Sequence, residues 1–206
     1  MLIQNQVGPI ATTASIAPGT QAPARAGQLG ETIVTELHGR YYEQAYRRNL
    51  YWAANQAATA TSVALSTTNT GLCISNPAGN TYNLVLLKVG ITLSVAPAAI
   101  APIGIQTGYL AAGVVTHTTP LVPASAYIGV GASPTAKADA ACTTVGTPAI
   151  TAMIMGGFTA AALPSASPAL IDLEGSIILP PGAWASIYTL TAVTGIFSFM
   201  WEEVPQ

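Results

Sequence analysis

The chain has 206 residues, half of them hydrophobic, but only 7% are charged and the formal net charge is −2. Soluble monomers usually carry about a quarter charged residues, so this composition is typical of a protein whose surface is covered by partners. Six Lys and Arg residues give no basic face for duplex nucleic acid, which we therefore exclude as a partner. The length fits one β-sandwich or barrel with its own core.

Membrane insertion is the main rival explanation for the apolar composition. The longest candidate, Ala149 to Leu163, is bounded by prolines and is about 15 residues long, whereas a spanning helix needs about 20. The N-terminus has no basic region followed by a compact apolar run, so we expect no secretory signal. These features predict neither a transmembrane helix nor a membrane partner.

The chain divides into an arm and a domain. Residues 1–30 are rich in Gly and Pro and poor in large apolar side chains, which predicts either a disordered tail or an extended arm that orders against a neighbouring subunit. Residues 31–48 form a charged segment that holds six of the fourteen charges. From residue 49 to 171 only Lys88, Lys137 and Asp139 are charged. We expect residues 31–206 to form a single domain.

Residues Leu84 to Val95 carry the clearest structural signal, because apolar residues from Val85 to Val95 alternate with Lys88, Gly90 and other polar or small residues. This period of two predicts a long β-strand with one buried face. Further short apolar runs, separated by Pro and Gly, predict strands at 103–110, 126–130, 150–158, 170–179, 184–193 and 196–201. No helical period interrupts them. We therefore predict an all-β fold, an antiparallel, jelly-roll-like β-sandwich with an extended N-terminal arm.

The last predicted strand has large side chains on both faces. Phe197, Phe199 and Trp201 alternate with Ile196 and Met200. We expect both faces of this strand to be covered.

Two histidines are the first candidates for chemistry. His38 lies near Glu36, Glu43 and Tyr41, a set that could bind metal or act as a base, although a solvated surface cluster is the commoner arrangement. His117 stands among threonines, which predicts a polar loop residue. We therefore expect a metal chelator and the substitution His117→Ala to leave stability unchanged.

Carboxylates and cysteines give no further site. Asp172 and Glu174 would share one strand face, but two carboxylates alone make neither a glycosidase nor a calcium site. Cys73 and Cys142 are interpreted as small buried residues, with a single disulfide as the alternative. We predict no catalytic residue, no cofactor-binding residue, no metal site and no bound cofactor.

Four short stretches resemble small virion structural proteins of tailed bacteriophages. They are Gly39-Arg40-Tyr41-Tyr42-Glu43, Asn76-Pro77-Ala78-Gly79 with the strand after it, Pro180-Pro181-Gly182-Ala183-Trp184, and Met200-Trp201-Glu202-Glu203-Val204-Pro205. Some of these proteins are capsid cement or decoration proteins, jelly-roll-like and often trimeric. The resemblance implies a non-enzymatic protein on the capsid surface of the virion, assembled in the host cytoplasm, with the major capsid protein and copies of itself as partners.

Arginine and tyrosine, which are enriched at protein interfaces, are mixed in the charged segment. The candidate interface residues are Arg40, Tyr41, Tyr42, Tyr46, Arg47 and Arg48. A surface strand or short helix with solvated charges is the alternative interpretation.

Two further functions remain open at this point. A head-fibre or tail receptor-binding module could use Tyr109, Tyr127 and Trp184 to stack on host glycan, although core or subunit packing would also explain them. An enzyme is the third class, and no residue pattern favours it.

Overall fold

A computed structural model describes residues 39–111, 116–129, 133–158 and 169–206. The predicted arm, residues 1–30, lies outside this part of the chain, as do Glu36 and His38. The compact unit that contains every strand runs from Tyr41 to Gln206.

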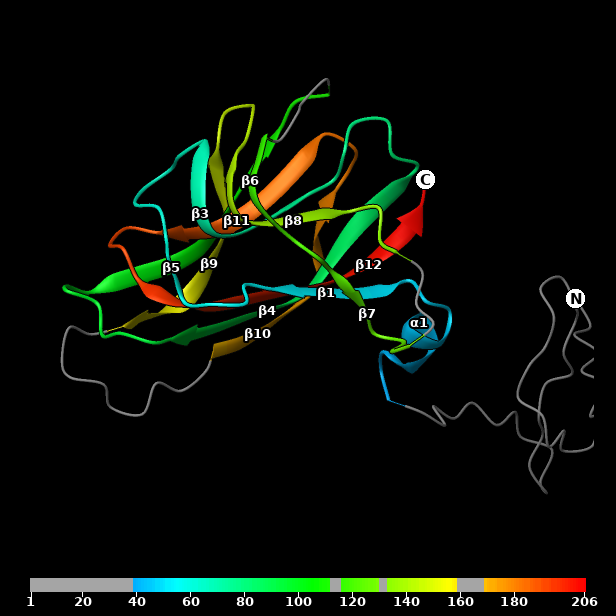
Figure 1. Cartoon of the computed structure of the whole chain (residues 1–206), viewed down its shortest axis with the longest axis horizontal. Coiled ribbons are helices and arrows are strands. Elements are labelled where there is room, and N and C mark those ends of the chain that lie inside the picture. The colour runs from blue at the N-terminus through cyan, green and yellow to red at the C-terminus, as the bar shows by residue number, and fades with distance from the viewer. Residues whose placement is uncertain (1–38, 112–115, 130–132, 159–168) are drawn as a thin grey trace, which may run out of the picture. The chain divides into compact units, whose positions relative to one another are not determined.

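One short helix and twelve strands make up the described part of the chain (Figure 1). In chain order they are α1 (Tyr42–Tyr46), β1 (Leu50–Ala54), β2 (Thr59–Ala60), β3 (Thr68–Ser75), β4 (Tyr82–Leu93), β5 (Ala101–Tyr109), β6 (Thr116–Leu121), β7 (Ala124–Ser125), β8 (Lys137–Thr143), β9 (Ala149–Phe158), β10 (Ala169–Leu179), β11 (Ala183–Thr189) and β12 (Thr194–Pro205).

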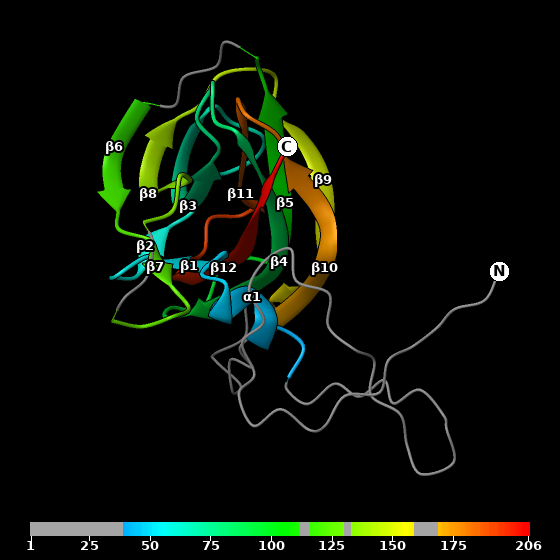
Figure 2. The same ribbon diagram turned by 90° about the vertical axis from the view of Figure 1, so that its right-hand side faces the viewer.

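The strands form two antiparallel six-stranded sheets that pack against each other (Figure 2). Sheet 1 has the order β10-β4-β12-β1-β7, with β2 also paired to β12, and sheet 2 has the order β6-β8-β3-β11-β5-β9. Eight strands remain when the short or peripheral strands β2, β6, β7 and β8 are set aside. These eight have the order of a jelly roll. Successive strands alternate between the two sheets, except that β5 and β9 follow each other in the same sheet. The predicted β-sandwich is confirmed.

The core lies between the sheets and is built from alternate residues of the paired strands. Its largest fully buried side chains include Trp201, Phe197 and Phe199 from β12 and Ile103 and Ile105 from β5. Burying such side chains provides the main driving force for the fold, roughly 1.5–3 kcal/mol for each.

The long predicted strand is confirmed as β4, but its alternation changes within the strand. The pairing with β12 steps from Lys88 opposite Met200 to Leu86 opposite Trp201, so Leu87 is an extra residue in a β-bulge. Beyond the bulge Leu84 and Leu86 face the core, whereas Val85 and Leu87 belong to a separate cluster outside it. The prediction that Val85 and Leu87 share the buried face of Val89 was therefore wrong.

The expectation that both faces of β12 are covered holds for one end of the strand. Met200 is buried on the outer face of sheet 1, beside Leu50 and Leu87. Ile196, on the same face, keeps 45% of its surface exposed. The difference arises because residues around α1 cover only the end of the sheet that contains Met200.

Three other features differ from the sequence-based expectation. The predicted strand at 126–130 is wrong, because residues 126–129 form bends and a turn after the short strand β7. The strand β6 contains His117, which the sequence placed in a loop. The strand β8 has only the small side chains of Ala138, Ala140 and Cys142 at its alternate positions, so it gave no apolar signal.

Candidate interface around helix α1

Helix α1 ends in a tight turn that fixes Arg48. The N–H of Asn49 donates to the carbonyl of Gln44, and the N–H of Arg48 donates to the carbonyl of Ala45, both at 3.0 Å. These two bonds form a Schellman motif, in which the residue after the helix C-cap, called C′, adopts a left-handed conformation and is usually glycine. Arg48 occupies that position with φ of 63°, a conformation that costs a residue with a Cβ roughly 1–2 kcal/mol.

A small apolar cluster holds α1 against the outer face of sheet 1. Leu50, Leu87 and Met200 are buried there, and Tyr41 and Ala45 pack on them from the helical segment. This cluster is separate from the core between the sheets. It therefore gives the segment a defined position on the β domain.

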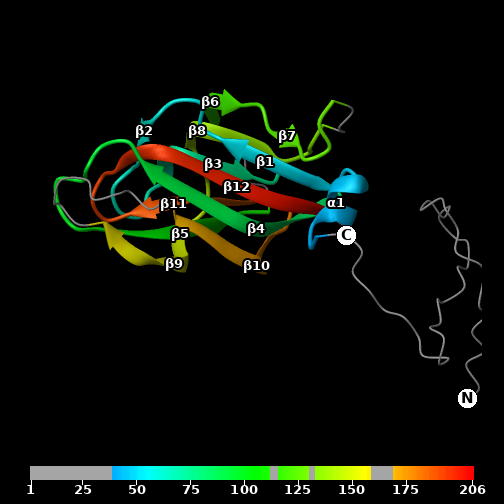
Figure 3. The same cartoon turned by 90° about the horizontal axis from the view of Figure 1, so that it is seen from below.

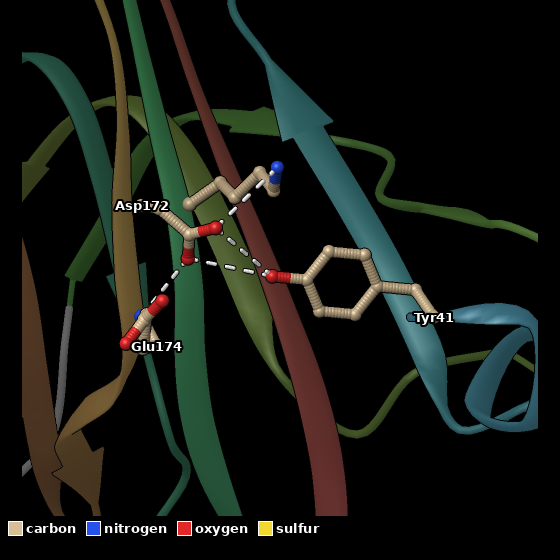
Figure 4. A network of polar contacts seen from close by, with 4 residues as sticks. Tyr41, Asp172 and Glu174 are labelled. Atoms are coloured by element: carbon tan, nitrogen blue, oxygen red, sulfur yellow. Dashed lines mark hydrogen bonds and ion pairs between the residues drawn. The ribbon is translucent and has the colours of Figure 1, made fainter. Parts of the chain in front are cut away.

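Tyr41 reaches across β12 and β4 to Asp172 on β10 (Figure 4). Its hydroxyl lies 3.4 Å from both carboxylate oxygens of Asp172. The ammonium of Lys88 lies 3.6 Å from Asp172 and 5.2 Å from the centre of the Tyr41 ring. The backbone N–H of Glu174 donates to Asp172 over 3.1 Å. Tyr41 and Asp172 thus belong to a polar network that joins the residue before α1 to the edge strand β10.

The two aromatic residues within α1, Tyr42 and Tyr46, are exposed to solvent. The rings of Tyr42 and Tyr46 stack at 5.9 Å, and the two residues are 44% and 52% exposed. The guanidinium of Arg48 lies 5.3 Å from the centre of the Tyr127 ring, which is a cation–π contact. Arg47 interacts electrostatically with Glu202 on β12. Burial raises the pKa of Glu202, and the positive charge of Arg47 partly lowers it.

Five of the six predicted interface residues therefore gather at one end of sheet 1. Tyr42, Tyr46 and Arg48 are exposed, and Arg48 also lies over the Tyr127 ring. Tyr41 packs on the apolar cluster, and Arg47 interacts electrostatically with Glu202. Arg40 is exposed and precedes the compact unit.

Sequence reasoning missed the apolar residues beside this segment. Val122 and Ile128, which flank β7, are 92% and 91% exposed, and Trp52 on β1 is 41% exposed. Ala126 donates its N–H to the carbonyl of Leu50, which ties the turn after β7 to β1. These residues come together only because β7 and the turn after it pair with β1. The spacing of residues along the sequence does not reveal such a pairing.

The predicted loop histidine, His117, is instead paired with a buried carboxylate. Its Nδ1 lies 2.7 Å from Oδ2 of Asp139 on the neighbouring strand β8. Asp139 is fully buried, while the His117 side chain is 37% exposed. Burial raises the pKa of Asp139, and the hydrogen bond and charge of His117 partly lower it. The pair links the edge strand β6 to its neighbour β8 within sheet 2.

The carboxylates of Asp172 and Glu174 do not share a regular strand face as expected. The pairing of β10 with β4 is interrupted between Asp172 and Ile177, and Glu174 has φ of 51°. In the part of the chain that the structure describes, no three His, Cys, Asp or Glu side chains come together as metal ligands.

The cysteines are free and buried, as the first interpretation predicted. Cys73 and Cys142 form a cluster with Trp184 on the outer side of sheet 2. Trp184 is fully buried, and its indole N–H donates to the carbonyl of Val145 over 2.7 Å. A Cβ on Gly108 would lie 2.5 Å from the Trp184 ring, so glycine leaves room for it. Trp184 is therefore a packing residue and cannot stack on a glycan.

Tyr109 has a different environment, at the rim of a cleft between β9 and β10. The cleft has a volume of about 570 Å³ and is lined by Tyr109, Thr107, Thr151, Ser176 and Ile178 among others. The Thr107 and Thr151 hydroxyls hydrogen bond to each other. Tyr109 is 56% exposed. An exposed ring beside several hydroxyls is an arrangement that can bind a polar ligand.

Within the described ranges, no helix has the length and apolar character needed to span a bilayer. Comparison of the chain with protein-family models, with curated proteins and with solved structures found no match.

Proposed function

We propose that this protein is a structural component of a tailed-phage virion that decorates and stabilises the outside of the major capsid shell, as a homotrimer and without enzymatic activity. The observation that carries the proposal is an apolar surface with very few charges. Among the described residues, large hydrophobic side chains remain exposed on β1, β5, β9, β10 and β12 and on several turns. A surface of this kind is used for extensive protein contact.

The few charges are unevenly distributed, which supports the same proposal. Six charged residues of the β domain lie in or near the α1 end of sheet 1, namely Arg47, Arg48, Lys88, Asp172, Glu174 and Glu202. Between residues 89 and 171 only Lys137 and Asp139 are charged. Contact surfaces are depleted in charge at their centre and polar at their rim. The charge-poor remainder of the domain therefore suits contacts with a shell and with other copies.

The jelly-roll strand order adds weaker support. This architecture occurs in viral capsid proteins and also in lectins and cupins, so the fold alone does not determine function. The proposal joins the fold to the sequence resemblance and to the surface composition.

The proposal is tested by locating the protein on intact particles of the phage that encodes it. Cryo-electron microscopy with a bound Fab fragment should show a regular lattice of label over the shell. Recombinant protein should also co-sediment with shells that lack the native protein and raise their melting temperature. Label that is missing from the shell, or shells with unchanged stability, would refute the proposal.

The cleft at Tyr109 favours a second candidate, a head-fibre or tail receptor-binding module that contacts host glycan. Label confined to the tail or to a few fibres would support this candidate. A Tyr109→Ala variant would then lose binding to host cells, whereas it would keep shell binding if the first proposal holds.

A further inference from the structure

The cleft at Tyr109 lies on the side of the sandwich where both sheets end. Sheet 2 ends at β9 and sheet 1 ends at β10, and these two edge strands lie along the same side of the domain (Figures 2 and 3). Residues of β5, β9 and β10 line the cleft between them. Its volume of about 570 Å³ is within the range of small-molecule sites, which is about 300–1,000 Å³.

Each of the two edge strands has an irregularity at the cleft that places a hydroxyl residue there. The pairing of β9 with β5 skips Thr151, which is the extra residue of a β-bulge. The pairing of β10 with β4 is interrupted between Asp172 and Ile177, and Ser176 lies in that interruption. Thr151 and Ser176 both line the cleft. Bulges at sheet edges change the direction of side chains and are frequent beside functional sites.

The polar groups of the cleft are hydroxyls. Those of Thr107, Thr147, Thr151 and Ser176 line it, and the Thr107 and Thr151 hydroxyls hydrogen bond to each other. A hydroxyl both donates and accepts, so two hydroxyls that share one bond can still bond to a ligand. None of the lining residues in the described part of the chain is charged. The charged residue nearest along the chain is Glu174, two residues before Ser176, and it is acidic. These groups favour a neutral ligand that is rich in hydroxyls.

The cleft also presents apolar surface beside the hydroxyls. The residues Tyr109 and Ile178 are 56% and 55% exposed. A sugar ring has C–H groups on its faces and hydroxyls at its rim, so an aromatic ring beside hydroxyl side chains matches both of its parts. An apolar ligand would cover the hydroxyls without bonding to them, which costs free energy.

The backbone of Tyr109 is held in place by the loop after β8. Gly146 in this loop has φ of 86°, and a Cβ on it would lie 2.7 Å from the Tyr109 carbonyl oxygen. Only glycine permits so close an approach. The loop is itself fixed, because the indole of the buried Trp184 donates to the carbonyl of Val145. A site that is ordered before its ligand arrives loses less conformational entropy on binding.

We propose that this cleft binds a neutral saccharide, with the Tyr109 ring against a sugar face and the hydroxyls of Thr151 and Ser176 bonded to sugar hydroxyls. The proposal goes beyond attachment to a shell, and it gives the second candidate function its ligand class. It does not depend on where the protein lies on the particle, because binding is a property of the isolated chain.

Titration of soluble saccharides into the full-length protein tests the site. The probes are neutral trisaccharides of glucose, of galactose and of N-acetylglucosamine, with a sialylated trisaccharide as the anionic comparison. Ligand-observed NMR detects binding and calorimetry measures the dissociation constant. The wild type should bind at least one neutral probe, and the sialylated probe at least about tenfold more weakly. Absence of binding to every neutral probe at millimolar concentration, or a preference for the sialylated probe, would overturn the proposal.

Substitutions test whether binding occurs in the cleft. Tyr109→Ala removes the ring and should raise the dissociation constant by at least about tenfold, whereas Tyr109→Phe keeps the ring and should stay within about threefold of the wild type. Tyr127→Ala, at a partly exposed tyrosine outside the cleft, is the matched control and should bind as the wild type does. Equal binding by Tyr109→Ala and Tyr127→Ala would overturn the proposal. Circular dichroism verifies that each variant is folded.

Failure of this proposal and failure of the proposed shell function give different results. A protein that forms a lattice over the shell but binds no saccharide keeps the shell function and overturns the saccharide site. A protein that binds saccharide through Tyr109 but is missing from the shell does the reverse. Loss of shell co-sedimentation in Tyr109→Ala, without saccharide binding by the wild type, would assign the cleft to the shell protein and would also overturn the saccharide site.

Discussion

The Nδ1 atom of His117 lies 2.7 Å from Oδ2 of Asp139, and this contact joins the edge strand β6 to β8. The other carboxylate oxygen of Asp139 is buried and has no hydrogen-bond partner. His117 thus supplies the main compensation for a buried carboxylate. This finding replaces the sequence-based expectation that His117 has no structural role.

Substitution of His117 by Ala is therefore expected to destabilise the domain by about 2–3 kcal/mol at pH 7, because it leaves Asp139 buried without its partner. This loss of stability is smaller than the loss expected when a wholly buried ion pair is broken, because the His117 side chain is partly exposed. Urea unfolding followed by tryptophan fluorescence measures the change. Thr118→Ala, an exposed substitution on the same strand, is the control, and equal stability of the two variants would contradict the prediction.

The stability should also depend on pH through Asp139. Burial raises the pKa of Asp139 above its usual value, with His117 partly lowering it, so the folded state binds this proton more tightly than the unfolded chain. The protonated carboxyl then stabilises the fold at low pH, and this contribution is lost as the pH rises through the raised pKa. His117 contacts this carboxyl directly, and Cys73 lies near enough to interact with its charge.

Unfolding of the wild type and of Asp139→Asn between pH 3.5 and 5.5 isolates this effect, because residue 139 of the variant does not titrate. We expect the free energy of unfolding of the wild type to fall relative to that of Asp139→Asn as the pH rises. Thr118→Ala should follow the wild type at every pH. A wild type that instead gains stability relative to Asp139→Asn over this range would indicate a lowered pKa.

Strands with large apolar side chains were predictable from the sequence. The structure contains β4, β5, β9 and β10 within a few residues of their predicted bounds, because alternating Ile, Leu and Val mark a half-buried strand. These local signals were sufficient for the fold class.

Features that depend on pairing between distant segments were not predictable. The Ala and Thr residues of β6 and β8 form strands because β8 pairs with β3 and β6 pairs with β8. The bulge at Leu87 needs the register with β12, and the His117–Asp139 contact needs β6 to pair with β8. In the candidate interface, the sequence identified Arg48 but could not place Tyr127 beneath it.

The cysteine thiols should be unreactive in the native protein. Cys73 and Cys142 are each 1% exposed, and the hydrogen bond with Cys142, together with burial, raises the pKa of Cys73. A thiol reacts as the thiolate, so both burial and the raised pKa slow the reaction. We expect a chromogenic disulfide reagent to label neither thiol in buffer and both in denaturant. Two thiols labelled rapidly in buffer, or none in denaturant, would contradict this.

The β domain is expected to fold without residues 1–30. In the described part of the chain, the buried residues lie between Leu50 and Glu203, so removing the arm takes away none of these core side chains. Thermal melting of the truncated and full-length proteins should give similar midpoints. The arm, extended at about 3.3–3.6 Å per residue, can reach on the order of 100 Å, so under the proposed function its loss should weaken co-sedimentation with shells that lack the native protein. A truncated protein that unfolds would place the arm in the core. Undiminished binding would place the attachment outside residues 1–30, and the segment from Arg40 to Arg48 is then the next place to substitute.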